Sequence, residues 1–180
     1  MTAEPAAVTP VLPEALRERI VAEFPKYPEK RAVLLTALHF TQEAFEGWIP
    51  KETVPEIAEL LELQPIEVWE VVYFYAMFNS EPVGRCHVRV CTNLSCCLRG
   101  ARPLMRRLEE LLGVRPGEVT KDGRFSVGEV ECLGSCGTAP VVQINNEVYR
   151  ENVGIDDLPG LLDELRQRLD ARDAEGESKE

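Results

Sequence analysis

The sequence predicts an α+β chain, with an N-terminal all-α helical bundle followed by an α/β domain. Its 180 residues, 44% hydrophobic and 28% charged, have the composition of a globular protein with one domain or two small ones. Apolar residues recur at helical spacing through residues 14–79, and alternation typical of strands begins near residue 85. Pro82 and Gly84 mark the junction. The expected organisation is a flexible tail at 1–13, a helical domain at 14–81, an α/β domain at 84–170 and a charged tail at 171–180.

Four helices are expected in the first domain. The first covers residues 14–24 and turns Leu16, Ile20 and Val21 inward; the second holds Pro28 in its first turn and runs to about Phe45; the third spans Val54 to Leu61; the fourth runs from Ile66 to Phe78. The fourth helix is apolar almost all round. Such a helix is either buried in the centre of the bundle or covered by a partner.

The second domain reads as strand, helix, strand, hairpin and helix. The strands are expected at 86–91 and 125–130, a helix on the stripe from Leu104 to Leu112, a tight hairpin around Asn145–Asn146 and a last helix from Leu158 to Leu169. This order predicts a mixed sheet covered by two helices, and it resembles the thioredoxin-like arrangement.

Charge and motifs exclude several functions. The net charge of −11 argues against nucleic acid and against an anionic membrane surface as partners. The longest apolar run, Val71 to Phe78, is far shorter than the about 20 residues of a spanning helix, so we expect a cytoplasmic protein with no direct membrane insertion. Neither a nucleotide-binding glycine motif nor a nucleophile with its base is present, so we expect no catalytic residues and no complete active site in this chain.

The cysteines carry the most informative pattern. Cys91 and Cys96 form a C-x4-C pair, and Cys132 and Cys136 form a C-x3-C pair 35 residues further on. Each pair follows a predicted strand, so the four thiols converge if the strands are parallel neighbours. Four thiolates suit a [2Fe–2S] cluster, but both spacings also suit structural zinc. Buried structural thiols are the third alternative.

Two further cysteines are expected to be spare. Cys86 reads as a small packing residue at the start of its strand. Cys97 directly follows Cys96, and adjacent side chains point apart, so only one of them is expected to be a ligand. Near an anionic cluster, Gly134 and Gly137 would let backbone N–H groups approach, and Arg99 would add positive potential.

Longer motifs resemble a known family. VCTNLSCCLRGA (90–101), PGEVTKDGRF (116–125) and VECLGSCGTAPVVQINNEVY (130–149) are similar to the thioredoxin-like [2Fe–2S] subunit of bacterial NADH:quinone oxidoreductase (complex I). GWIP (47–50) and VVYFYAMF (71–78) extend the resemblance into the helical half. The same module occurs in NAD-linked hydrogenases and formate dehydrogenases.

The resemblance implies a function and partners. The cluster ligands would be Cys91, Cys96, Cys132 and Cys136, and the chain would be an electron-transfer subunit. Its cluster would exchange single electrons with FMN in a partner flavoprotein subunit that also binds NADH, among other peripheral-arm subunits, on the cytoplasmic side of a respiratory complex. The alternatives are the equivalent subunit of a soluble hydrogenase or formate dehydrogenase, a stand-alone thioredoxin-like ferredoxin, and a structural zinc module.

Overall fold

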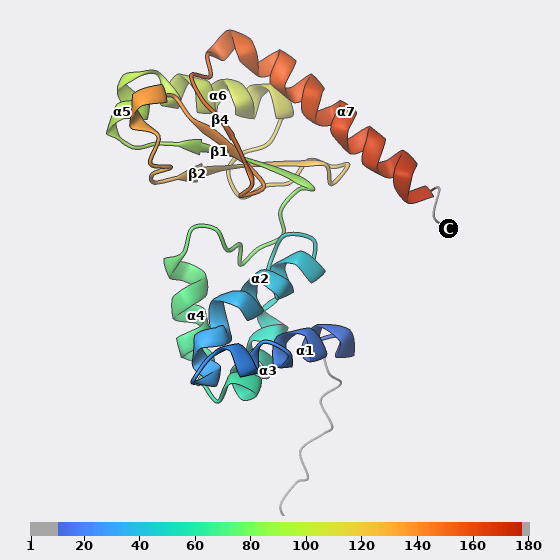
Figure 1. Cartoon of the computed structure of the whole chain (residues 1–180). Helices are drawn as coiled ribbons and strands as arrows, with labels where there is room; N and C mark the ends of the chain where they lie inside the picture. Colours follow the sequence, from blue (N-terminus) through green and yellow to red (C-terminus); the bar gives the residue numbers. More distant parts are fainter. Residues whose placement is uncertain (1–10, 178–180) are drawn as a thin grey trace, which may run out of the picture. The chain divides into compact units, whose positions relative to one another are not determined.

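A computed structural model describes residues 11–177 of the chain (Figure 1). The chain divides into two units, Met1–Glu81 and Pro82–Glu180, and each is described by itself. None of the helices described in residues 11–177 has both the length and the apolar character needed to cross a membrane.

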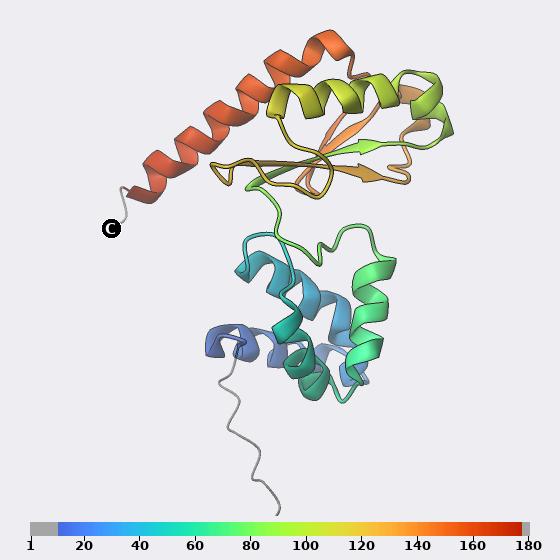
Figure 2. The ribbon, with the colours of Figure 1, turned by 180° about the vertical axis from the view of Figure 1, so that it is seen from behind.

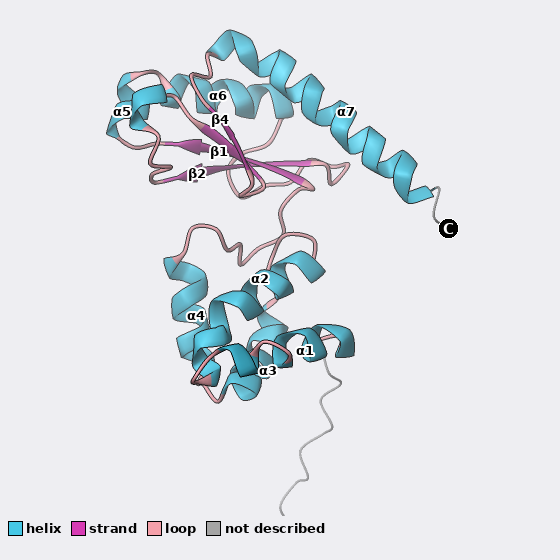
Figure 3. Ribbon diagram, viewed as in Figure 1, coloured by secondary structure: helices cyan, strands magenta, loops and turns pink. Residues whose placement is uncertain are grey.

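The first unit is all-helical (Figure 3). Its α-helices are α1 (Glu14–Val21), α2 (Leu34–Ala44), α3 (Val54–Leu61) and α4 (Pro65–Phe74), and short 3₁₀ turns cover Phe24–Lys26, Lys30–Val33 and Lys51–Thr53. Apolar residues at helical spacing form its core, which includes Leu16, Ile20, Leu38, Ile57, Leu61 and Val68.

Three expectations for this unit need correction. Val21 is 42% exposed, because α1 ends there and only Leu16 and Ile20 reach the core. The second helix begins at Leu34 and not near Pro28, since the segment before it forms a 3₁₀ turn. The expected tail reaches into the core at Leu12, which is 2% exposed, and residues 1–10 lie outside the described part.

Helix α4 is shorter and more exposed than its composition suggests. It starts with a capping box between Gln64 and Glu67, has Pro65 at its first turn and ends at Phe74. Val68 and Val72 are buried, but Ile66, Tyr73 and Phe74 are 64%, 72% and 79% exposed. The helix therefore is not buried all round. One side packs into the bundle and the other presents an aromatic face.

The second unit contains a four-stranded sheet in the order β2-β1-β3-β4. Its strands are β1 (Cys86–Cys91), β2 (Phe125–Val130), β3 (Val142–Ile144) and β4 (Val148–Arg150). Strands β1 and β2 are parallel and pair Cys86 with Phe125 and Cys91 with Val130, whereas β1–β3 and β3–β4 are antiparallel. The expected strands and hairpin are confirmed; Asn145 and Asn146 at the turn have φ of 50° and 62°.

Helices cover one face of this sheet. The parallel β1–β2 pair needs a crossover, which contains α5 (Leu94–Leu98) and α6 (Ala101–Leu112). Helix α7 (Leu158–Glu177) lies on the same side of the sheet as α6 in both views (Figures 1 and 2). Residues of the expected charged tail from 171 thus continue α7 to Glu177, and 178–180 lie outside the described part.

The opposite face of β1 carries a buried polar network. His87 Nδ1 lies 2.7 Å from Ser126 Oγ on β2, and Arg89 Nη2 donates to Gln143 Oε1 on β3 at 2.7 Å. Gly128 makes room for the imidazole, because a Cβ there would lie 3.0 Å from His87 Cε1. Burial, assisted by the Arg89 charge, lowers the pKa of His87 to about 4. His87 is therefore neutral at physiological pH.

Candidate iron–sulfur site

The first cysteine pair lies at the carboxyl end of β1. Cys91 is the last strand residue, and its N–H donates to Val141 O at 3.0 Å. The next residue, Thr92, donates its N–H to Val130 O at 3.0 Å, which ties the chain to the end of β2. Asn93 then caps α5 by accepting from Leu94 N at 2.8 Å. The end of β1, the hydrogen bond from Thr92 to β2 and the capped turn of α5 thus place Cys96 next to Cys91.

Helix α5 was not expected from the sequence, which predicts only a loop between the paired cysteines. It is five residues long, too short to show a periodic apolar pattern. The signal that could have found it is Asn93, a preferred N-cap residue, directly before Leu94.

The structure separates the roles of Cys96 and Cys97. Cys96 is 3% exposed and packs in the core of the unit, whereas Cys97 is half-buried. The Cys97 thiol donates to Thr92 O at 3.1 Å. Burial, and then a hydrogen bond with Cys91, raise the pKa of Cys96; the neighbouring Cys91 and Cys136 charges act in the same direction. Cys96 therefore interacts with Cys91 of its own pair and with Cys136 of the second pair.

The second pair lies in the loop after β2. Cys132 and Cys136 are exposed, and Gly134 N donates to Cys132 Sγ at 3.4 Å. Gly134 has φ of 73°, a conformation in which a side chain would be strained. This amide–sulfur contact is the kind of backbone donation that the sequence predicts near an anionic cluster.

Hydrogen bonds that the sequence did not reveal hold this loop. Ser135 Oγ hydrogen-bonds to the Glu151 carboxylate and lies 2.7 Å from Thr138 Oγ1. Hydrogen bonds from Ser135 and Thr138 hold the pKa of Glu151 below its usual range. Asn152 N also donates to Thr138 O at 2.7 Å. Glu151 follows β4 in the chain, so no local motif could have linked it to the cysteines.

Cys91 and Cys136 both act on the buried Cys96 thiol, and both thiols of the second pair, Cys132 and Cys136, are exposed. Among the described residues no set of three or more His, Cys, Asp or Glu side chains is already gathered in a metal-binding arrangement. The donor set nevertheless fits an iron–sulfur cluster. Thiolates this close repel one another unless iron neutralises them, and Gly134 offers an N–H to sulfur.

Cys86 lies apart from these thiols, at the first position of β1. It is 3% exposed, and burial raises the pKa of its thiol to about 11 against the opposing charges of Arg172 and Arg168. The thiol therefore stays protonated. These features agree with the packing role expected for it.

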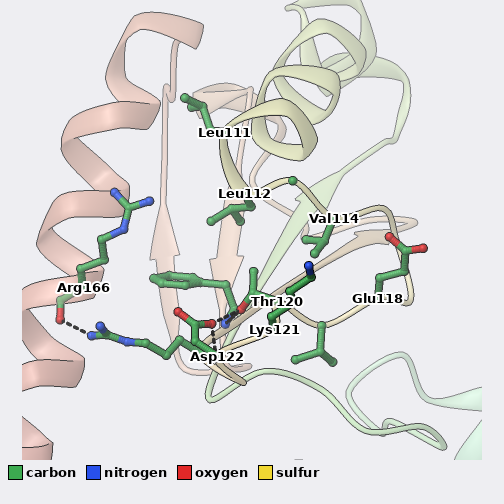
Figure 4. Close-up of a pocket in the computed structure, with 12 residues that line it drawn as sticks. Leu111, Leu112, Val114, Glu118, Thr120, Lys121, Asp122 and Arg166 are labelled. Carbon is green, nitrogen blue, oxygen red and sulfur yellow. Dashed lines mark hydrogen bonds between the residues drawn. The ribbon is translucent and has the colours of Figure 1, made fainter.

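A pocket of this unit lies away from the cysteines. It lies between the end of α6, the segment before β2 and α7, and its lining includes Leu112, Val114, Lys121 and Arg166 (Figure 4). Phe125 also lines it. Phe125 is the first residue of β2, and the cysteine loop follows the last. The pocket is thus at the opposite end of the strand, and no cysteine lines it.

Parallel strands with a cysteine pair at the carboxyl end of each define a protein of thioredoxin-like fold with four cysteines next to one sheet edge. Comparison with known proteins agrees. The chain belongs to the thioredoxin-like [2Fe-2S] ferredoxin family, whose model matches residues 19–166. The cofactor is accordingly a [2Fe–2S] cluster, and the predicted fold class and family are confirmed.

Two relatives are subunits of NADH-quinone oxidoreductase. The chain is 42% identical over 153 residues to such a subunit of Rickettsia bellii, covering 84% of this chain and 90% of that one. It is 49% identical over 145 residues to NADH-quinone oxidoreductase subunit 2 of Thermus thermophilus, covering 79% and 80%.

A solved structure shares the fold. An NAD+-reducing [NiFe]-hydrogenase in the H2-reduced state matches with a TM-score of 0.62 and 23% identity, over 74% of this chain and 22% of that one. The chain therefore spans about a fifth of the hydrogenase chain.

Proposed function

We propose that Cys91, Cys96, Cys132 and Cys136 hold the [2Fe–2S] cluster, and that the chain is the electron-transfer subunit of an NADH:quinone oxidoreductase. The observation that carries this is the buried Cys96 thiol, which interacts with Cys91 of its own pair and with the charge of Cys136 of the second pair, next to the end of the parallel strands β1 and β2. The similarity to oxidoreductase subunits of two bacteria supports the choice of host complex.

When bound, the cluster supplies one-electron redox chemistry. The residues of this chain determine where it sits and how it is held. Strand β1 positions Cys91, and the capped turn of α5 positions Cys96. The hydrogen bond between Ser135 and Glu151 holds the loop that carries the second pair of cysteines. One edge of the sheet therefore presents the cluster to a partner, while α6 and α7 lie over a face of that sheet.

The partner in this proposal is the flavoprotein subunit that binds FMN and NADH, within a set of peripheral-arm subunits on the cytoplasmic side of the membrane. Hydride chemistry belongs to that flavoprotein. This chain would accept or return single electrons.

The test is low-temperature EPR of anaerobically purified protein before and after dithionite, with iron, sulfide and zinc measured on the same sample. We expect about two irons and two sulfides per chain and a signal that appears only on reduction. A sample with one zinc, no sulfide and no signal would overturn the proposal. Protein that stays free of iron after anaerobic reconstitution with iron and sulfide would also overturn it.

A further inference from the structure

A row of exposed arginines begins beside the first ligand pair. Arg99 caps the C-terminal end of α5, and Arg102 and Arg106 lie one turn apart on α6. Two leucines of α5 are also largely exposed, Leu94 at 71% and Leu98 at 79%. We name these five residues the α5–α6 patch.

The arginines of this patch are free of ion pairs among the described residues, in contrast to most other arginines of the unit. Arg107, on another side of α6, pairs with Glu110 at 3.0 Å. Elsewhere in the unit, ion pairs of 2.5 to 2.6 Å join Arg85 to Asp173, Arg124 to Asp170 and Arg150 to Glu164. Three arginines without an ion pair among the described side chains thus follow the first ligand pair closely in the chain.

The surroundings indicate what such a patch binds. The chain as a whole carries a net charge of −11, so an acidic molecule is repelled by most of its surface and attracted here. Exposed leucines on α5, followed closely by exposed arginines on α5 and α6, suit a protein surface that offers both apolar and acidic groups. They match a phosphate backbone poorly, since that needs many more basic contacts and no apolar ones.

We infer that the α5–α6 patch docks an acidic, partly apolar surface of the electron-exchanging partner. This inference rests on the proposed function and names the surface through which it is carried out. Cys96 lies in α5 between Leu94 and Leu98, so a partner bound to these leucines lies beside a ligand of the cluster. The arginines orient the partner on approach, and the leucines supply the buried contact.

The experiment measures binding of the purified FMN-binding subunit of the same complex to the cluster-loaded full chain by stopped flow and titration calorimetry. The variants are Arg99→Glu/Arg102→Glu/Arg106→Glu and Leu94→Ser/Leu98→Ser. The matched control is Arg107→Glu, which reverses a charge on the same helix outside the patch. Iron content and the EPR signal of every variant must equal those of the wild type, so that binding is compared between loaded, folded chains.

We expect the triple reversal to lower the association rate on the order of tenfold or more at low salt, with the deficit shrinking as the Debye length falls to about 8 Å near 0.15 M. The leucine variant should mainly raise the dissociation rate, and Arg107→Glu should bind within about twofold of the wild type. Equal binding by the triple variant and the wild type would overturn the inference and leave the proposed function intact. If the wild type itself does not bind the FMN-binding subunit, both this inference and the partner named in the proposed function are refuted. A change in the oligomeric state of the chain alone in the triple variant would assign the patch to a second copy and also overturn the inference.

Discussion

Cys96 and Cys97 are adjacent and chemically identical, yet their replacement should have opposite consequences. Cys96 is 3% exposed and interacts with Cys91 and Cys136, while the Cys97 thiol is turned to Thr92 O at 3.1 Å. We predict that Cys96→Ala loses the cluster and that Cys97→Ala retains it.

The structure sets the size of the difference. Cys97→Ala removes one weak S–H hydrogen bond at a half-buried position, so it should cost no more than about 0.5–1 kcal/mol of unfolding free energy. Its effect on cluster affinity should stay below the roughly 10- to 100-fold of a lost outer-shell contact. Cys96→Ala removes a thiolate ligand outright, so iron should fall from about two per chain to nearly zero.

The assay is iron and sulfide content with EPR of the reduced proteins, followed by the rate of cluster loss to a chelator. Cys97→Ser is the control, because its hydroxyl can still donate to Thr92 O. An empty Cys97→Ala protein beside a fully loaded Cys96→Ala protein would refute the ligand assignment and the reasoning from burial.

Three further predictions test the surrounding structure. Burial lowers the pKa of His87 from 6.5 to about 4, so in this pH range the unfolded chain binds a proton that the native chain excludes. Acidification from pH 7 to 4 should therefore lower the free energy of unfolding of the wild type by about 3 kcal/mol more than that of His87→Gln. Equal pH dependence of the two proteins in urea unfolding would contradict this. Glu151→Ala should speed cluster loss to a chelator by about tenfold, because it frees the second ligand loop from its hydrogen bond with Ser135. The control Glu147→Ala, at an exposed position of the hairpin, should leave the rate unchanged. Identical rates in both variants would show that the Ser135–Glu151 hydrogen bond does not hold the cluster loop. Phe74 is 79% exposed, so Phe74→Ser should change the unfolding free energy by less than about 0.5 kcal/mol. Leu61 is 1% exposed, so the comparison variant Leu61→Ala should lose about 2–5 kcal/mol. A large loss in Phe74→Ser would mean that the aromatic face of α4 is packed.

Local patterns predicted much of the fold. The strands at 86–91 and 125–130 have the expected bounds, because alternating apolar residues between turn signals are read within one short window. The hairpin at Asn145–Asn146 follows from the tolerance of Asn for positive φ. The break before Leu34 and the exposure of α4 were missed, since apolar periodicity does not reveal which side of a helix has a partner to pack on.

The candidate site, too, could be predicted from the sequence only in part. Cysteine spacing and the surrounding motifs named Cys91, Cys96, Cys132 and Cys136 from sequence alone, and a zinc site stayed open until the family match identified the cofactor. Spacing could not distinguish Cys96 from Cys97, because neighbouring residues share every local pattern.

The sequence by itself determined the order of the elements, the chemistry of the thiols and the family, all of which depend on residues close together in the chain. Tertiary structure decided which thiol is buried, that Glu151 braces the second ligand loop, and that Arg99, Arg102 and Arg106 have no ion pair among the side chains that the structure describes. These features depend on contacts between segments far apart in sequence. Such contacts exist only once parallel pairing of β1 with β2 has brought both loops to one edge of the sheet.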